Sequence, residues 1–237
     1  MEQIFVVDPY RNALHNFINT LNENAGAFGI PGGINLSNAN LQPYTLRLHT
    51  QLKAGANSYD LDLKNANNQL SIEKRLVDGD IFQAYGMCMA IQKYDPTAPD
   101  FSTQLLTHPD PTYFPDTEAK CLELLYNGKT VFNTNSTNRI QDFDNHLFRY
   151  SPPGVFTGTL AAPVTNPGYG ATLEQRGYYI FPSYPIIEGN KTNKIQVNLA
   201  QGATTNIGGT GADSNNLVIL IHGFRYSGFN GGGSCQA

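Results

Sequence analysis

Short segments in which every second residue is apolar are the feature that most constrains the fold of this chain. One such segment covers residues 43–52, and its regularly spaced apolar residues are Tyr44, Leu46, Leu48 and Leu52. A second covers residues 58–64, where the apolar members are Tyr59, Leu61 and Leu63. A period of two places successive side chains on opposite faces of a strand, so both segments are predicted to be half-buried β-strands.

Further strands are predicted along the rest of the chain. The candidate segments are apolar and bounded by turn-forming residues, and they cover residues 70–75, 81–94, 178–187, 194–199 and 217–224. Residues 120–133 are predicted to form a hairpin, because Asn127-Gly128 is the pair that a two-residue turn prefers. The chain then holds about ten strands and shows no alternation of helices with strands, which argues against a parallel sheet.

Two long connections interrupt the predicted strands. Residues 95–118 contain five prolines and little periodicity, and residues 151–174 begin with a Pro-Pro-Gly turn. Both are predicted to be long ordered loops that join parts of the sheet system. A chain of 237 residues fits one all-β domain, so residues 1–237 are assigned to a single domain.

One amphipathic helix is predicted near the N-terminus, over residues 9–22. Asp8 is a suitable N-cap and Pro9 occupies the first helical position. The apolar residues that fall on one helical face are Tyr10, Leu14, Phe17, Ile18 and Leu21. This face either covers one end of the chain's own barrel, which is the favoured interpretation, or docks on a neighbouring subunit or an underlying layer.

These elements predict an all-β fold, an antiparallel two-sheet sandwich of the jelly-roll type or a related Greek key. One short N-terminal helix accompanies the sheets. A double barrel needs about sixteen strands, which is more than the chain offers, so a single barrel is favoured.

The composition narrows the function classes. Charged residues make up 14% of the chain and the net charge is -4, with no basic arm, so we expect no specific nucleic-acid partner. No secretion signal and no run of roughly 20 apolar residues is found, so we expect synthesis in a host cytoplasm and no membrane span. The three cysteines, Cys88, Cys121 and Cys235, are far apart and are predicted to be free thiols, with Cys88 in the core.

Candidates for catalytic chemistry are weak. Asp142, Asp144 and His146 lie on one side of an extended segment and form the best metal-like cluster, although a solvated loop with capping aspartates is the favoured interpretation. The segment 217–224 ends in His222-Gly223 like the oxyanion strand of α/β-hydrolases, but no nucleophile elbow follows it. We therefore expect a non-catalytic protein that binds no cofactor.

Aromatic residues in the predicted loops are the remaining candidates for function. The chain contains thirteen Tyr, thirteen Phe and no Trp, and the loop members singled out are Tyr113, Phe114 and Tyr169. Such residues suit protein contacts or sugar stacking. Sugar sites usually rely on Trp, so protein contacts are favoured, and we group these three residues with the apolar helix face as candidate interaction residues.

In its chain order, the sequence resembles the jelly-roll capsid proteins of tailless icosahedral bacteriophages. The likeness consists of the N-terminal helix at 9–21, paired strands with elaborate loops, and the terminal strand at 217–224, and it includes no signature motif. The resemblance implies a trimer or pentamer of barrels tiled into a shell, with or without an internal membrane beneath it. The chain departs from this family in being short for a double barrel and in lacking a basic arm.

The leading hypothesis is a virion structural protein, a major capsid or vertex component, that self-assembles and contacts other virion proteins. The loops 95–118 and 151–174 would make the contacts between subunits. The alternative is a non-catalytic receptor- or carbohydrate-binding jelly-roll module at a virion or cell surface. A cupin-like metal enzyme is the third hypothesis. It ranks last because cupins bind their metal through several His from neighbouring strands, whereas the five His of this chain are dispersed along the sequence.

Overall fold

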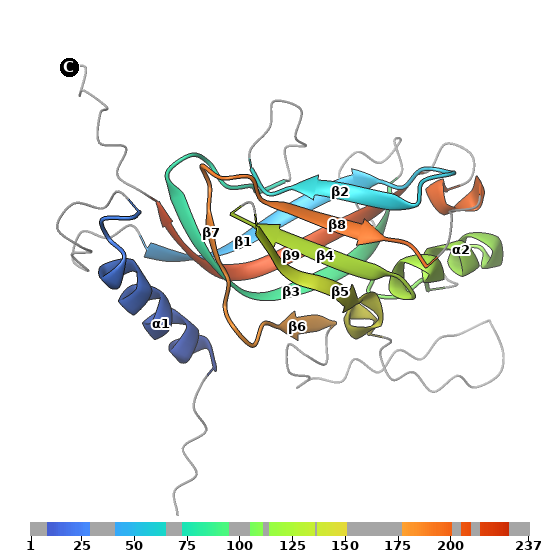
Figure 1. The fold of residues 1–237 in the computed structure, drawn as a ribbon. Helices are drawn as coiled ribbons and strands as arrows, with labels where there is room; N and C mark the ends of the chain where they lie inside the picture. Colours follow the sequence, from blue (N-terminus) through green and yellow to red (C-terminus); the bar gives the residue numbers. More distant parts are fainter. Residues whose placement is uncertain are drawn as a thin grey trace, which may run out of the picture.

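The computed structural model describes residues 9–28, 41–64, 73–94, 105–110, 114–135, 137–150, 177–200, 205–209 and 214–227. The elements, in chain order, are α1 (Pro9–Glu23), β1 (Leu41–Gln51), β2 (Ser58–Asp62), β3 (Asp80–Tyr94), α2 (Asp116–Tyr126), β4 (Lys129–Thr134), β5 (Thr137–Asp144), the 3-10 helix η1 (Asn145–Phe148), β6 (Tyr178–Ile180), β7 (Ile186–Glu188), β8 (Lys194–Asn198), the 3-10 helix η3 (Thr205–Gly208) and β9 (Ser214–Ser227). Figure 1 shows the strands in two layers, with α1 and α2 near opposite ends.

The strands form two antiparallel sheets. The first, sheet A, has the order β1-β9-β3-β6, with β7 also paired to β3, and the second, sheet B, has the order β2-β8-β4-β5. Every pair of neighbouring strands is antiparallel. Within the described residues, the predicted all-β, antiparallel two-sheet architecture is therefore confirmed.

The pairings are nested along the chain. The first strand pairs with the last, β1 with β9, and the second pairs with the next to last, β2 with β8. Between these strands in the sequence, β3 pairs with β6 and β7, and β4 pairs with β5. Because the first and last strands must meet, no complete sheet A exists until the C-terminal strand is in place.

The core between the sheets comes from one face of each strand. In β9 the inward members are Leu217, Ile219 and Ile221, and in β3 they are Met87, Met89 and Ile91. On sheet B the predicted alternation of β2 is confirmed, because Tyr59 and Leu61 are buried while Asp60 and Asp62 are exposed. Burial of such side chains contributes about 1.5–3 kcal/mol each, so this interface dominates the stability of the fold.

A second core lies on the outer face of sheet A. Ala13, Phe17 and Leu21 of α1 are fully buried there, against a set of sheet residues that consists of Ile81, Tyr85, Phe224 and Tyr226. The helix predicted at 9–22 is confirmed, and its apolar face packs on the chain's own sheet. Neither α1 nor α2 is long and apolar enough to span a membrane, as far as the described residues go.

The predicted hairpin at 120–133 is wrong in its first arm. Residues 116–126 form α2, whose buried members Leu122, Leu125 and Tyr126 recur at helical spacing, while Asp116 and Glu118 lie in the first turn. Acidic residues there interact favourably with the helix dipole. Asn127-Gly128 ends the helix instead of turning a hairpin, and the prediction of a single helix is wrong for the same reason.

Other boundaries differ from the sequence-based expectations. The segment 178–187 is split into β6 and β7, both of which pair with β3. The predicted loop 95–118 already contains the start of α2 at Asp116. Within the predicted strand 70–75 only residues 73–75 are described, and the predicted loop 151–174 lies outside the described residues.

Residues 73–76 join the two sheets along one side of the sandwich. Backbone hydrogen bonds of 2.8 and 3.0 Å link Lys74 to Arg47 on the free edge of β1. Leu76 N donates to Leu63 O, just beyond β2, at 2.8 Å. The edge of sheet A is thereby partly covered, which protects an edge strand from pairing with other chains.

We predict that Gly223→Ala destabilises the fold severely. Gly223 lies in β9 where a Cβ atom would fall 2.0 Å from the backbone oxygen of Gln83 and 2.5 Å from the Phe82 ring. The adjacent strand cannot retreat without breaking pairing, so we expect a loss of at least about 3 kcal/mol in the free energy of unfolding, measured by urea denaturation.

Gly26→Ala is the matched control, because a Cβ atom at Gly26 would meet nothing within 4 Å. We expect this variant to unfold within about 0.5 kcal/mol of the wild type. Equal stability of the two variants would contradict the close approach of β9 and β3 at Gly223.

Candidate functional site

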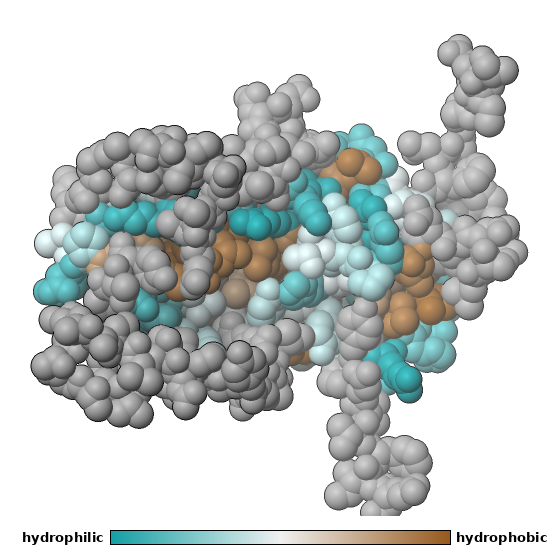
Figure 2. All heavy atoms as spheres, turned by 180° about the vertical axis from the view of Figure 1, so that it is seen from behind, coloured by the Kyte–Doolittle hydropathy of each residue, from teal (hydrophilic) through white to brown (hydrophobic). Residues whose placement is uncertain are grey.

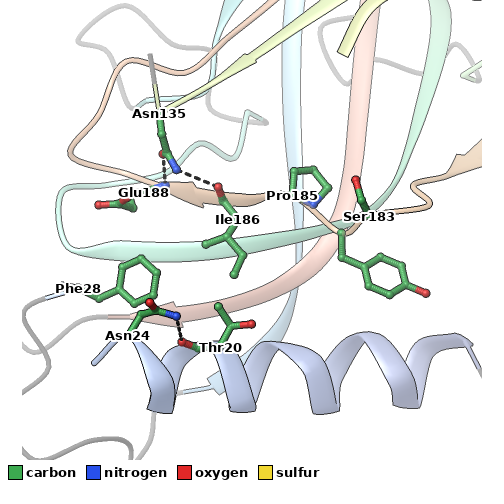
Figure 3. A pocket seen from close by; sticks show the side chains of 9 residues that line it. Thr20, Asn24, Phe28, Asn135, Ser183, Pro185, Ile186 and Glu188 are labelled. Atoms are coloured by element: carbon green, nitrogen blue, oxygen red, sulfur yellow. Dashed lines mark hydrogen bonds between the residues drawn. The ribbon is translucent and has the colours of Figure 1, made fainter. Parts of the chain in front are cut away.

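A cavity of about 510 Å³ lies where the C-terminal end of α1 faces β7 and the β6–β7 connection. We call it the α1–β7 groove and define it by six of its lining residues: Thr20, Asn24, Phe28, Ser183, Ile186 and Glu188. Figure 3 shows the helix residues on one side of the groove and the strand residues on the other. Its volume is in the range of small-molecule binding sites.

Asn135 fixes the strand side of the groove. Its amide nitrogen donates to Ile186 O at 3.0 Å, and its amide oxygen accepts from Glu188 N at 2.8 Å (Figure 3). These two backbone groups lie on one edge of β7, so the side chain occupies the place that a neighbouring strand would take. Asn135 also adopts a φ of 52°, the left-handed conformation that Asn tolerates better than most residues.

Asn193 completes the link between the sheets. It is 2% exposed, its Oδ1 accepts from Asn135 N at 2.7 Å, and its Nδ2 donates to Glu188 O at 2.7 Å and to Lys191 O at 2.9 Å. Asn135 follows β4 and Asn193 precedes β8, both in sheet B, whereas β7 belongs to sheet A. The two asparagines therefore join the sheets at the groove and hold its wall in one conformation.

We predict that Asn193→Ala lowers the free energy of unfolding by about 1–3 kcal/mol, because it leaves partly buried backbone groups without partners. Asn135→Gly keeps the left-handed backbone available and removes only the amide, so it isolates the two hydrogen bonds to β7 and should lower the same quantity by about 1–3 kcal/mol. Urea denaturation measures both effects.

The exposed Asn57→Ala is the control for these two variants, with an expected change within about 0.5 kcal/mol. If Asn193→Ala and Asn57→Ala were equally stable, the link between the sheets would be disproved.

The metal-like cluster is not assembled in the described residues. His146 Nδ1 lies 4.0 Å from Asp144 Oδ2, and the two side chains are 65% and 58% exposed. The side chain of Asp142 lies outside the described part of the chain. No group of three or more His, Cys, Asp or Glu that could hold a metal ion occurs among the described residues.

The candidate interaction residues of α1 contact the chain's own sheet. Phe17 and Leu21 are fully buried in the second core, and Leu14 packs against it. Ile18 is half-buried, and the side chain of Tyr10 lies outside the described residues. Of the other candidates, Phe114 is not a loop aromatic on the surface, because it is 0% exposed in the main core just before α2. Tyr113 and Tyr169 lie outside the described residues.

The outer face of sheet A carries more apolar residues beyond α1. Cys88, Ala90 and Val218 point away from the main core and are at most 3% exposed, although they belong to neither core cluster. Figure 2 shows apolar side chains gathered over this face. Burial raises the pKa of Cys88 to about 12, so this free thiol is a small buried residue, as predicted, and a poor nucleophile.

His222 is a packed residue of the same face. Its Nδ1 and Thr45 Oγ1 are hydrogen-bonded at 2.7 Å, and its ring stacks on Tyr178 with centroids 4.6 Å apart. Burial lowers its pKa, which favours the neutral ring. The strand-end histidine that resembles a hydrolase motif is thus engaged by its neighbours in the sheet.

A buried polar cluster surrounds His49 on β1. Arg47 Nε donates to His49 Nε2 at 2.8 Å, and Glu73 Oε1 accepts from His49 N and from Arg75, both at 2.8 Å. The neutral ring must carry its proton on Nδ1, because Nε2 is the acceptor. Burial, followed by the Arg47 charge, lowers the pKa of His49 from 6.5 to about 4.

We predict that this histidine makes the protein less stable in mild acid. The pKa is lower in the folded than in the unfolded chain, so the unfolded chain binds more protons as the pH falls below 6.5, and the free energy of unfolding decreases until the pH reaches about 4. The full contribution is roughly 3 kcal/mol.

Urea denaturation between these pH values should show a smaller decrease in His49→Gln than in the wild type. His15→Gln, at an exposed position of α1, is the control and should keep the wild-type decrease. An unchanged pH dependence in His49→Gln would rule out the buried neutral ring.

Comparison with known proteins gives no relative: no family model, no curated protein and no solved structure matches this chain. The residues of the α1–β7 groove therefore come from geometry alone. No sequence pattern pointed to Asn24, Phe28 or Glu188, because they lie in separate segments without a shared motif. The only local sign at the groove is an Asn at a β-turn position, Asn135, which is a common and unspecific feature.

Proposed function

We propose that the chain is a single jelly-roll barrel that acts as a building block of a protein shell, a capsid component that packs beside copies of itself. The observation that carries the proposal is the nested pairing of β1 with β9, β2 with β8, β3 with β6 and β7, and β4 with β5. A long antiparallel hairpin with this nesting gives two facing sheets when it is rolled up, which is the arrangement of a jelly roll.

The interior of the sandwich supports a structural role over a metal enzyme of the cupin type. The space between the sheets is filled by large apolar side chains, among them Phe132, Phe181 and Tyr126. His49 and His222 alternate with the core residues Leu48 and Ile221, so both ring systems lie on the outer face of sheet A. A cupin requires His from neighbouring strands inside the barrel.

The surface also suits contacts between copies. The chain has few charges and a net charge of -4, so identical copies meet with little repulsion or ion desolvation. Leu147 in η1 is 45% exposed, and it lies four residues before Ser151, where the loop predicted to make subunit contacts begins. An exposed leucine at that position can be buried by a neighbouring copy.

Light scattering on the purified full chain during size-exclusion chromatography, followed by electron microscopy, tests the proposal. We expect the mass of a trimer, a pentamer or a larger assembly, and Leu147→Glu should lower the fraction assembled at equal concentration. A charge at the centre of an apolar contact opposes association, because it must be desolvated.

Val77→Glu is the matched control, because Val77 is 44% exposed in a different connection, between residues 73–76 and β3. This variant should assemble like the wild type. A wild-type chain that stays monomeric at every concentration would overturn the proposal, whatever the variants do.

A further inference from the structure

We infer that the α1–β7 groove binds a neutral sugar, a function separate from assembly. The groove is concave, about 510 Å³ in volume, and lies between the C-terminal end of α1 and β7 of sheet A (Figure 3). Among the described residues, its lining combines amide and hydroxyl side chains with two aromatic residues, Phe28 and Tyr184, and a single carboxylate. Four properties of this lining, namely charge, open hydrogen-bonding groups, apolar surface and rigidity, select the ligand class.

The charge of the groove excludes ionic ligands. Among the described residues no Lys, Arg or His lines the groove, so a phosphate, sulfate or acidic sugar would find no cation in this lining, and the nearby Lys191 is already paired with Glu188. The one carboxylate, Glu188, is paired with Lys191 Nζ at 2.5 Å, and this pair leaves little net charge to attract a cation. The ligand that fits is polar and neutral.

Several hydrogen-bonding groups of the groove have no partner within the described residues. Asn24 Nδ2 donates to Thr20 O at 3.0 Å, which orients the amide and leaves its Oδ1 available to a ligand. The hydroxyl groups of Thr20 and Ser183 and the second oxygen of Glu188 likewise lack a protein partner in this part of the chain. Such groups match vicinal hydroxyls, which donate and accept hydrogen bonds from one edge of a sugar ring.

The apolar part of the lining matches the C–H face of a sugar. Phe28 is half-buried and packs against the second core, and it also lines the groove. Its contact with the second core holds the ring in place at the edge of the groove. Pro185 and Ile186 provide further apolar surface on the strand side. A pyranose has apolar C–H groups on one face and hydroxyls at its rim, which is the pattern that this lining complements.

The walls are held in place before any ligand arrives. Asn135 and Asn193 hold β7 by its backbone, and the ring of Tyr184 stacks on Tyr85 with centroids 5.8 Å apart. On the other side, α1 is anchored by Phe17 and Leu21 in the second core. A preformed site avoids the entropic cost of ordering its walls on binding.

Saturation-transfer NMR on the full chain tests the inference with a panel of methyl glycosides of glucose, galactose, mannose, N-acetylglucosamine and N-acetylgalactosamine. We expect signal transfer to at least one neutral glycoside and none to the methyl glycoside of N-acetylneuraminic acid. For the glycoside that binds, Asn24→Ala and Phe28→Ala should each weaken the affinity about 10-fold, the effect of losing one hydrogen bond to a ligand or one ring face.

Phe28→Leu accompanies Phe28→Ala, because it keeps the apolar volume that packs on the second core and removes only the aromatic face. Asn57→Ala, outside the groove, should bind like the wild type. The inference is overturned if no neutral glycoside receives signal, if the methyl glycoside of N-acetylneuraminic acid binds instead, or if binding is unchanged in both Asn24→Ala and Phe28→Leu. Light scattering on the same samples reports assembly independently, so a failure here leaves the proposed shell role untouched.

Discussion

The position of β9 between β1 and β3 is the constraint on which the rest of the structure depends. This strand, the last among the described residues, lies at the centre of sheet A and pairs along its length with both neighbours. The contacts that complete the sheet are therefore among the most distant in sequence, which predicts slow folding. Both apolar cores rest on this strand, because its two faces carry residues of the main core and of the second core.

Burial on both faces explains why two strand segments lack a clean alternation of apolar and polar residues. The segments 81–94 and 217–224 read as nearly continuous apolar runs, unlike the clean alternation of β2. In β9, Ile219 and Ile221 face sheet B, whereas Val218 and Phe224 are buried on the outer side. A strand that is covered on both sides carries apolar residues on both faces, so the period of two is weakened.

Local patterns predicted most of the strands and α1, because their burial follows a fixed period along the chain. They failed at α2, where Leu122 to Tyr126 can bury an apolar face either as a strand or as a helix, and Asn127-Gly128 favoured the wrong choice. Local patterns also do not show which residues are buried by segments that are distant in the sequence. Phe114 looked like a loop aromatic, and only the three-dimensional packing places it in the core.

The groove could not be predicted, because its walls come from α1, from the β6–β7 connection and from an asparagine between β4 and β5. No local spacing links such positions, and Asn135 acts on β7 through its side chain, which sequence patterns do not reveal. The proposed shell role and the proposed sugar site use different parts of the molecule. Both presuppose the same rigid sandwich, in which two asparagines join the sheets at one end.

Native-state hydrogen exchange, followed by NMR, tests the central position of β9 most directly. We expect the amides of residues 217–224 to exchange only through global unfolding, with the same free energy as those of the paired residues in β3. Exchange of the β9 amides through local opening, at rates like those of a frayed helix end, would contradict the account of sheet A.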